Sequence, residues 1–268
     1  MPRLTMYQVD AFADRVFGGN PAAVLILDDW LPAAVMQAIA EENNLAETAF
    51  ARPGSAGGWD LRWFTPTHEV NFCGHATLAT AHVLAAERGE PGDLAFATRI
   101  GELRVTRGEG GVAGDYVLDL PCLRPEPIGN EPPVLARIFA GLPRRSFRNF
   151  ENIFVELADE AALRAFVPDL TAIATLTPPG LVITARGESH DFVSRYFVPA
   201  EGIPEDPVTG SIHATLVPYW ADKLGRSELS AFQCSKRGGH LRCTLAGDRV
   251  LIGGSAVTFM EATIRLPD

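Results

Sequence analysis

One stretch of this sequence occurs twice, and the repeat limits what the chain can fold into. Residues 63–84 and 196–217 both run from an aromatic residue and Phe, through Pro and a loop, to a glycine and the tetrapeptide His-Ala-Thr-Leu. The tetrapeptide begins at His75 in the first copy and at His213 in the second. Self-similarity of this kind is typical of chains built from two halves with one plan. We therefore expect two domains of the same architecture.

The elements around the repeat predict an α+β fold. Both tetrapeptides lie in expected helices, over residues 75–88 and 211–223, and the many small residues of the first helix suit a buried position. Gly89 and Gly225 follow these helices in the place of C-terminal caps. Short runs on either side predict mostly antiparallel strands, as a curved sheet around a central helix would need.

The length of the chain is sufficient for two modest domains. Its 268 residues are 47% hydrophobic and 21% charged, which is ordinary for a globular protein. A proline-rich segment over residues 121–127 resembles a connection between domains. The expected domains are therefore residues 1–120 and 121–268, with the option that the final strand returns to the first domain.

Charge and composition exclude several classes of partner. A formal net charge of −10 would repel both a nucleic acid and an anionic membrane surface. No segment reaches the roughly 18 continuous apolar residues of a membrane span, and no secretory leader opens the sequence. The four cysteines are scattered without a C-x-x-C spacing. We expect a cytoplasmic protein with reduced thiols, without a nucleic-acid or membrane partner.

The N-terminal ends of the two repeated helices are expected to bind an anion. Backbone N–H groups there have no intrahelical partner, and the helix dipole adds partial positive charge. The first end offers the amides around Gly74, and the second offers those of Gly210 and Ser211. The two ends could face each other across a cleft. A small carboxylate is therefore the expected ligand.

Three polar side chains near these helix ends could transfer a proton. Glu47 lies in an expected strand over residues 45–50, among apolar neighbours. One interpretation is a strand glutamate that reaches solvent; in the other the carboxyl is enclosed, which favours the protonated acid and suits general acid/base catalysis. His75 and Asp206, one beside each helix, are the other two candidates.

Cys73 supports a competing hypothesis of nucleophilic catalysis. A thiol at the N-terminal end of a helix is expected to ionise more easily. Cysteine is also among the most commonly buried residues, so a structural role stays equally open.

A glycine-containing segment has two possible interpretations, and the histidines and cysteines give no sign of a metal site. The segment Gly-Gly-Asn-Pro at residues 18–21 is either a hairpin turn or a glycine loop that approaches a ligand. No pair of histidines or cysteines has a spacing that selects a metal, so no metal site is expected. His68, His190 and His240 are expected to be ordinary surface or loop residues.

Four motifs, in order along the chain, resemble the PhzF-like family of phenazine-biosynthesis isomerases. They are Val-Phe-Gly-Gly-Asn-Pro at 16–21, Asn-Leu-Ala-Glu-Thr-Ala-Phe at 44–50, Cys-Gly-His-Ala-Thr-Leu-Ala at 73–79 and Asp-Pro-Val-Thr-Gly-Ser at 206–211. The likeness continues to Gly-Gly-Ser-Ala-Val at 253–257 and covers nearly the whole chain.

The resemblance implies a diaminopimelate-epimerase-like fold and a function. Each of two pseudo-symmetric domains would be a curved, mostly antiparallel sheet or open barrel around a central helix, with the active site between the domains. The resemblance also implies a homodimer, no cofactor, and isomerisation of a small, cyclic carboxylate. In that function Glu47 would carry the proton with the support of His75 and Asp206. The substrate would be bound by Asn20, Gly74, Gly210 and Ser211.

Two alternatives from other classes remain. Racemases and epimerases of the same fold use two cysteines, one at each helix; here Cys73 fills the first position and the second has no thiol, which disfavours a cysteine-dependent amino-acid epimerase. A relative that binds a small carboxylic acid without converting it would need the backbone amides but no side chain positioned for acid/base catalysis. The combined presence of Glu47, His75, Asp206 and Ser211 favours the enzyme.

Overall fold

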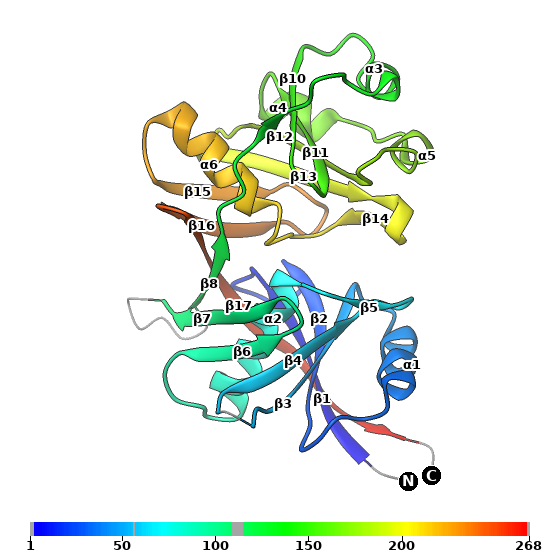
Figure 1. Cartoon of the computed structure of the whole chain (residues 1–268), viewed down its shortest axis with the longest axis vertical. Coiled ribbons are helices and arrows are strands. Elements are labelled where there is room, and N and C mark those ends of the chain that lie inside the picture. The colour runs from blue at the N-terminus through cyan, green and yellow to red at the C-terminus, as the bar shows by residue number, and fades with distance from the viewer. Residues whose placement is uncertain (1–2, 56, 109–114, 267–268) are drawn as a thin grey trace. The chain divides into compact units, whose positions relative to one another are not determined.

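The computed structural model describes residues 3–55, 57–108 and 115–266 (Figure 1). The chain divides into two compact units: residues 1–119 together with 253–268, and residues 120–252. Within its described residues, the chain has no helix long and apolar enough to cross a membrane.

Among the described residues of the first unit, eight strands pair into a ring. β2 with β3 and β4 with β6 are parallel; β1 with β17 and with β2, β3 with β4, β6 with β7 and β7 with β8 are antiparallel. β8 also pairs with β17, so the barrel is closed rather than open. The strands are β1 (Arg3–Ala11), β2 (Asn20–Ile26), β3 (Glu47–Pro53), β4 (Trp59–Phe64), β6 (Leu94–Thr98), β7 (Gly101–Arg107), β8 (Asp115–Pro121) and β17 (Arg249–Arg265), and β5 (Glu69–Val70) adds two residues beside β4.

The helix α2 (Gly74–His82) is the centre of this unit, and each of its nine residues is buried. It packs against β1, β2 and β3 (Figure 1). Small residues such as Ala76 and Ala79 let the strands approach closely. The expected regular helix over residues 75–88 is wrong in its last turn, because residues 83–87 wind as a π-helix whose wider hydrogen bonds the sequence does not signal. Gly89 follows with φ +72°.

The helix α1 (Ala33–Asn43) covers the outer side of the same strands (Figure 1). Met36 and Ile39 pack against a cluster that includes Phe50 of β3. Asn44 ends the helix in the left-handed region, with φ 49°. Since β3 is covered by α1 on one side and by α2 on the other, its residues 48–51 are all buried. The expected two-residue alternation of this strand therefore produces no exposed face.

The second unit repeats the pairing order of the first. β10 and β11 are antiparallel, β11 and β12 parallel, β12 and β13 antiparallel, β13 and β15 parallel, and β15 and β16 antiparallel. β1, β2, β3, β4, β6 and β7 pair in the same succession, which confirms the predicted pair of similar domains. The strands are β9 (Glu126–Pro127), β10 (Arg144–Arg148), β11 (Asn152–Leu157), β12 (Gly180–Arg186), β13 (Phe192–Val198), β14 (Ile203–Asp206), β15 (Glu228–Gln233) and β16 (Gly239–Ala246).

The helix α6 (His213–Leu224) takes the central position in the second unit. Its residues 213–221 are buried, and Gly225 caps it in the left-handed region. The prediction that Ser211 opens this helix is wrong by two residues, since Ser211 lies in a turn before His213. The outer side of the strands is covered by α3 (Pro133–Ile138), α4 (Glu160–Ala165) and α5 (Leu170–Ile173), and η2 (Pro199–Glu201) links β13 to β14.

Candidate active site

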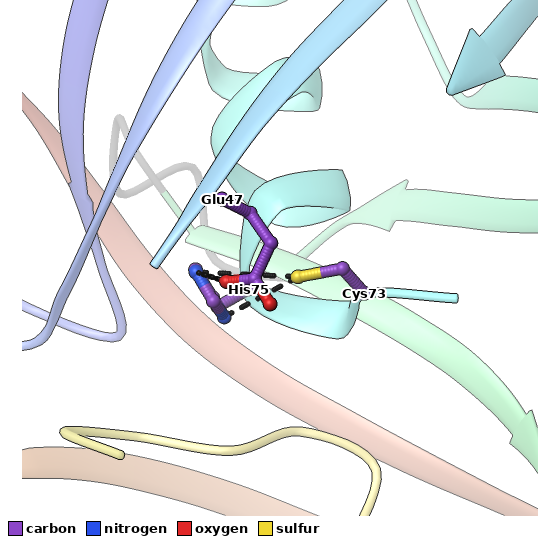
Figure 2. Close-up of side chains that lie close together, drawn as sticks. All are labelled: Glu47, Cys73 and His75. Atoms are coloured by element: carbon purple, nitrogen blue, oxygen red, sulfur yellow. Dashed lines mark hydrogen bonds and ion pairs between the residues drawn. The ribbon is translucent and has the colours of Figure 1, made fainter. Parts of the chain in front are cut away.

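Three side chains meet at the N-terminal end of α2: Glu47, Cys73 and His75 (Figure 2). The Nε2 atom of His75 lies 3.1 Å from Oε2 of Glu47. The Nδ1 atom of His75 lies 3.4 Å from Sγ of Cys73. The side chains of Glu47 and His75 are only 12% and 4% exposed, so the structure favours the enclosed interpretation of Glu47.

The local fold explains why residues far apart in sequence meet here. β2 and β3 run parallel, with Ala22 opposite Glu47, so Asn20 and Glu47 both lie near the starts of neighbouring strands. Helix α2 begins at Gly74 in the interior of the same barrel. His75 is thus the second residue of the helix and faces both strand ends.

The side chain of Asn20 contacts His75, and Asn20 is not part of an open glycine loop. β1 and β2 form an antiparallel hairpin connected by residues 12–19, and Asn20 and Pro21 already belong to β2, where they pair with Ala11 and Asp10. The Nδ2 atom of Asn20 lies 3.1 Å from Nδ1 of His75. In this orientation the amide donates to a neutral ring; with the amide turned over, its carbonyl oxygen accepts from Nδ1 of a protonated ring. Asn20 can therefore support both protonation states of His75.

The charge of Glu47 controls the protonation of His75. Burial alone would lower the pKa of His75, but the Cys73 sulfur and the Glu47 carboxylate raise it, and the net direction is well above the ordinary value. At neutral pH the Cys73 thiol is uncharged, so the Glu47 carboxylate is the group that raises the pKa of His75. The pair is best described as a carboxylate beside an imidazolium.

Cys73 does not behave as the helix-activated thiol considered from the sequence. Burial raises the pKa of Cys73 to about 11, with a further increase from the Glu47 carboxylate, and the lowering influence of His75 is smaller. The expectation of an easily ionised thiol is therefore wrong, because desolvation and a neighbouring negative charge outweigh the end of the helix.

In the described structure, one buried oxygen of Glu47 lies in an ion pair with His75 and not in a hydrogen bond. Among the residues that the structure describes, Oε2 of Glu47 has no hydrogen-bond partner, although His75 is within ion-pair distance. The approach of the two groups is close but not aligned as a hydrogen bond. A buried carboxylate oxygen in this position could accept a proton from a bound molecule.

The other predicted site residues lie just before α6: Asp206 ends β14, and Gly210 and Ser211 lie in the turn that follows. Asp206 is 5% exposed and accepts a hydrogen bond from the hydroxyl of Thr209. The buried side chain of Gln233 accepts from the Thr209 amide at 2.9 Å and donates to the Asp206 carbonyl at 2.8 Å. Sequence analysis missed Gln233, which lies in a later strand without a motif. That Asp206, Gly210 and Ser211 act together with Glu47 and His75 stays a prediction.

His213 occupies the position in α6 that His75 occupies in α2. Its Nδ1 lies 2.8 Å from the Thr209 carbonyl oxygen, to which it donates. Its Nε2 is buried without a hydrogen-bond partner in the described part of the chain. Burial lowers the pKa of His213 to about 4, against a smaller opposing influence of the Thr209 carbonyl. This ring is therefore neutral where His75 is charged.

The three side chains at the N-terminal end of α2 also contain donor atoms suited to a metal ion. Within the described ranges, one atom each of Glu47, Cys73 and His75 lie within 4.8 Å of one another. Sequence spacing did not suggest this set, because Glu47 comes from a different element. His190 and His240, expected to be unrelated surface residues, also contact each other.

Comparisons with known proteins agree with this architecture. The chain is 49% identical over 267 residues to an uncharacterized isomerase of Pseudomonas aeruginosa, covering 98% of this chain and 99% of that protein. The crystal structure of a PhzF-family protein from Enterococcus faecalis is 44% identical, with a TM-score of 0.92 over 99% of this chain and 100% of that one. A hydroxyproline epimerase from Agrobacterium vitis shares the fold alone, at 10% identity, with a TM-score of 0.62 over 99% of this chain and 93% of that one.

The sequence profile of one family matches almost the whole chain. It spans residues 9–262, and the family is described as phenazine biosynthesis-like protein. All four motifs and the central helices of both units lie inside this range. The chain belongs to the PhzF family of phenazine biosynthesis-like proteins.

Proposed function

We propose that this protein is an isomerase that moves a proton between two atoms of a small, cyclic carboxylate, with Glu47 as the general acid/base. The observation that carries the proposal is the enclosed carboxylate oxygen of Glu47, which has no hydrogen-bond partner among the described residues and lies beside His75. Isomerase is also the activity in the names of similar proteins.

The proposed reaction needs one group that can both take and return a proton. Oε2 of Glu47 accepts the proton from a substrate carbon, and the electrons of the broken C–H bond move into a neighbouring double-bond system. The protonated carboxyl, whose proton can exchange with solvent, then delivers a proton to a different carbon, where the new C–H bond forms. No oxidant or reductant enters this sequence, so no cofactor is required by its balance.

His75 is proposed to stabilise charge on both sides of the proton transfer. An imidazolium 3.1 Å from the carboxylate stabilises the negative charge before the transfer. After the transfer, the carboxyl is neutral and His75 faces the negative charge that develops on the substrate. The Asn20 amide orients the ring through Nδ1 in both stages.

The carboxylate of the substrate is proposed to bind at backbone N–H groups. The described structure has no side-chain cap hydrogen bond at the N-terminal end of α2; the Ala76 amide interacts with the Cys73 side chain, and the amides of Gly74 and His75 would bind the anion. Gly210 and Ser211 would supply the equivalent contact from the second unit, and Asp206 would orient the reacting atoms. We also propose that the protein acts as a homodimer.

The thiol mechanism has weaker support. With its pKa raised to about 11, the buried Cys73 would be a thiol at neutral pH and a poor base. The corresponding place before His213 in the second unit holds Ser211, which cannot act as the second thiol. A protein that only bound the carboxylate, without converting it, would not need the Glu47–His75 pair.

The test is exchange of substrate hydrogen with deuterium from the solvent. A panel of cyclic amino and hydroxy acids is incubated with wild type, Glu47→Gln and Cys73→Ala. General acid/base groups contribute roughly 10²–10⁴ in rate, so Glu47→Gln should lose at least that factor while it retains ligand binding. Cys73→Ala should lose much less. Exchange that survives Glu47→Gln but is abolished by Cys73→Ala would assign the chemistry to the thiol.

A further inference from the structure

The three donor atoms at the end of α2 have the spacing of a metal site. Sγ of Cys73 is 3.4 Å from Nδ1 and 4.0 Å from Nε2 of His75, and Nε2 is 3.1 Å from Oε2 of Glu47 (Figure 2). In tetrahedral zinc sites, bonds of about 2.0–2.3 Å place the ligand atoms roughly 3.3–3.6 Å apart. With Nε2 as the imidazole donor, its separations of 4.0 Å from the sulfur and 3.1 Å from the carboxylate oxygen are within about half an ångström of that spacing, and the cluster offers one donor atom per residue within 4.8 Å of the others.

The chemistry of the donors selects one class of ion. A thiolate is a soft ligand, an imidazole suits zinc and copper, and a carboxylate completes a mixed set typical of zinc. Magnesium and calcium prefer oxygen ligands only and would gain nothing from Cys73 or His75. The buried Oε2 of Glu47, without a hydrogen-bond partner in the described structure, supplies a lone pair at no cost in broken hydrogen bonds.

We propose that Glu47, Cys73 and His75 bind a thiophilic divalent cation, such as Zn²⁺, and that the ion blocks the candidate active site. On binding, the Cys73 thiol and the His75 imidazolium each release one proton to solvent, so that sulfur binds as a thiolate and His75 binds through a neutral ring nitrogen. Water would fill the fourth position. Binding of the ion does not depend on the proposed function, but its inhibitory effect does, because the ion occupies the same Glu47 oxygen that would accept the substrate proton.

A second place in the chain could hold the same ion and has to be separated from the first. Nε2 of His190 lies 3.1 Å from Nδ1 of His240, at the surface of the second unit. Both rings pack against Phe232. This pair offers two nitrogens and no sulfur, so it would bind more weakly and would lack any thiolate signal.

Cobalt(II) is the probe that distinguishes the two places. Cobalt bound to a thiolate shows a strong sulfur-to-metal charge-transfer band in the near ultraviolet, whereas a histidine pair gives none. Reduced wild-type protein is titrated with CoCl₂ and then with ZnCl₂, which should displace cobalt because zinc binds such sites more tightly. The variants are Cys73→Ser, which is nearly isosteric, and Glu47→Gln. The controls are Cys122→Ser, at the half-buried thiol outside the cluster, and His240→Gln.

The expected result is one charge-transfer band at one cobalt per chain in wild type, Cys122→Ser and His240→Gln. Cys73→Ser should abolish the band, and Glu47→Gln should weaken cobalt binding by at least roughly 10–100-fold, the loss typical of altered metal-site partners. Thermal unfolding without metal checks that each variant is folded, and zinc should raise the Tm of wild type but not of Cys73→Ser. MgCl₂ should change nothing.

Three results would overturn the proposal: no charge-transfer band, a band that Cys122→Ser removes, or zinc stabilisation that only His240→Gln abolishes. Failure of the proposed function is a separate outcome. It would leave the cobalt band intact while no member of the acid panel exchanges deuterium.

Discussion

The two central helices share the tetrapeptide His-Ala-Thr-Leu near their N-terminal ends, yet the pKa values of its two histidines shift in opposite directions. His75 in α2 lies beside a carboxylate that raises its pKa well above the ordinary value. His213 in α6 is equally buried, but without a neighbouring acid its pKa is lowered to about 4. The identical tetrapeptide thus fixes a packing position and not a chemical role. The residue that reaches each ring from the adjacent strand decides the role.

The difference originates at the first residue of the third strand of each repeat. β3 begins with Glu47, and the equivalent β12 begins with Gly180. A Cβ atom on Gly180 would lie 1.8 Å from Oδ1 of Asn152 and 2.9 Å from the ring of Tyr196. The second unit therefore has no room for an acid at the position where the first unit has one.

Replacement of the two histidines should give the largest contrast. His75→Gln removes the charge beside Glu47 and should lower the deuterium exchange rate by about 10²–10⁴. His213→Asn keeps a donor for the Thr209 carbonyl and should act mainly on stability. The measurement is exchange with the best member of the acid panel, with circular dichroism to confirm folding. Equal losses in the two variants would remove the functional asymmetry between the repeats.

Acid should destabilise the protein through His213. Its folded pKa of about 4 is below the ordinary value of about 6.5, so on acidification the unfolded chain takes up the proton first. The contribution is therefore complete above pH 6.5 and is lost as pH falls towards 4, by roughly 3 kcal/mol. Urea unfolding of wild type and His213→Asn between pH 4 and 7 measures it. Parallel pH dependences for the two proteins would show that His213 is not a buried neutral ring.

An attempt to install an acid in the second unit should fail on steric grounds. Gly180→Ala already places a methyl group against Asn152 and Tyr196, and overpacking of this kind costs about 1–3 kcal/mol. Gly180→Glu should cost more and should not create a second acid/base pair. Denaturant unfolding gives the free energies. If Gly180→Ala were as stable as wild type, steric exclusion would not explain the missing acid.

Replacement of Asn20 should have the smallest effect, and it distinguishes a role in orienting the His75 ring from a role in substrate binding. Asn20→Ala removes one hydrogen bond to His75, worth about 1 kcal/mol, or a factor of roughly five in rate. If Asn20 orients the ring, the loss should appear in kcat with KM unchanged. A raised KM at constant kcat would favour the substrate-binding role expected from the sequence.

The sequence predicted the architecture better than the chemistry. The repeated tetrapeptide predicted two buried helices, and the pairing order of the strands confirms one plan for both units. It could not predict the ionisation of Cys73, which depends on burial and on Glu47 together. It also missed Gln233 and the contact between His190 and His240, because these depend on long-range packing and carry no local pattern.

The difference between the two histidines is tested most directly by NMR titration of the imidazole rings. The protein has six histidines, and the variants His75→Gln and His213→Asn assign the two signals of interest. We predict that His75 remains protonated well above pH 6.5, that His213 stays neutral until pH approaches about 4, and that Glu47→Gln lowers the pKa of His75. Two rings that both titrate near pH 6.5, or a His75 midpoint unchanged in Glu47→Gln, would contradict the acid/base pair.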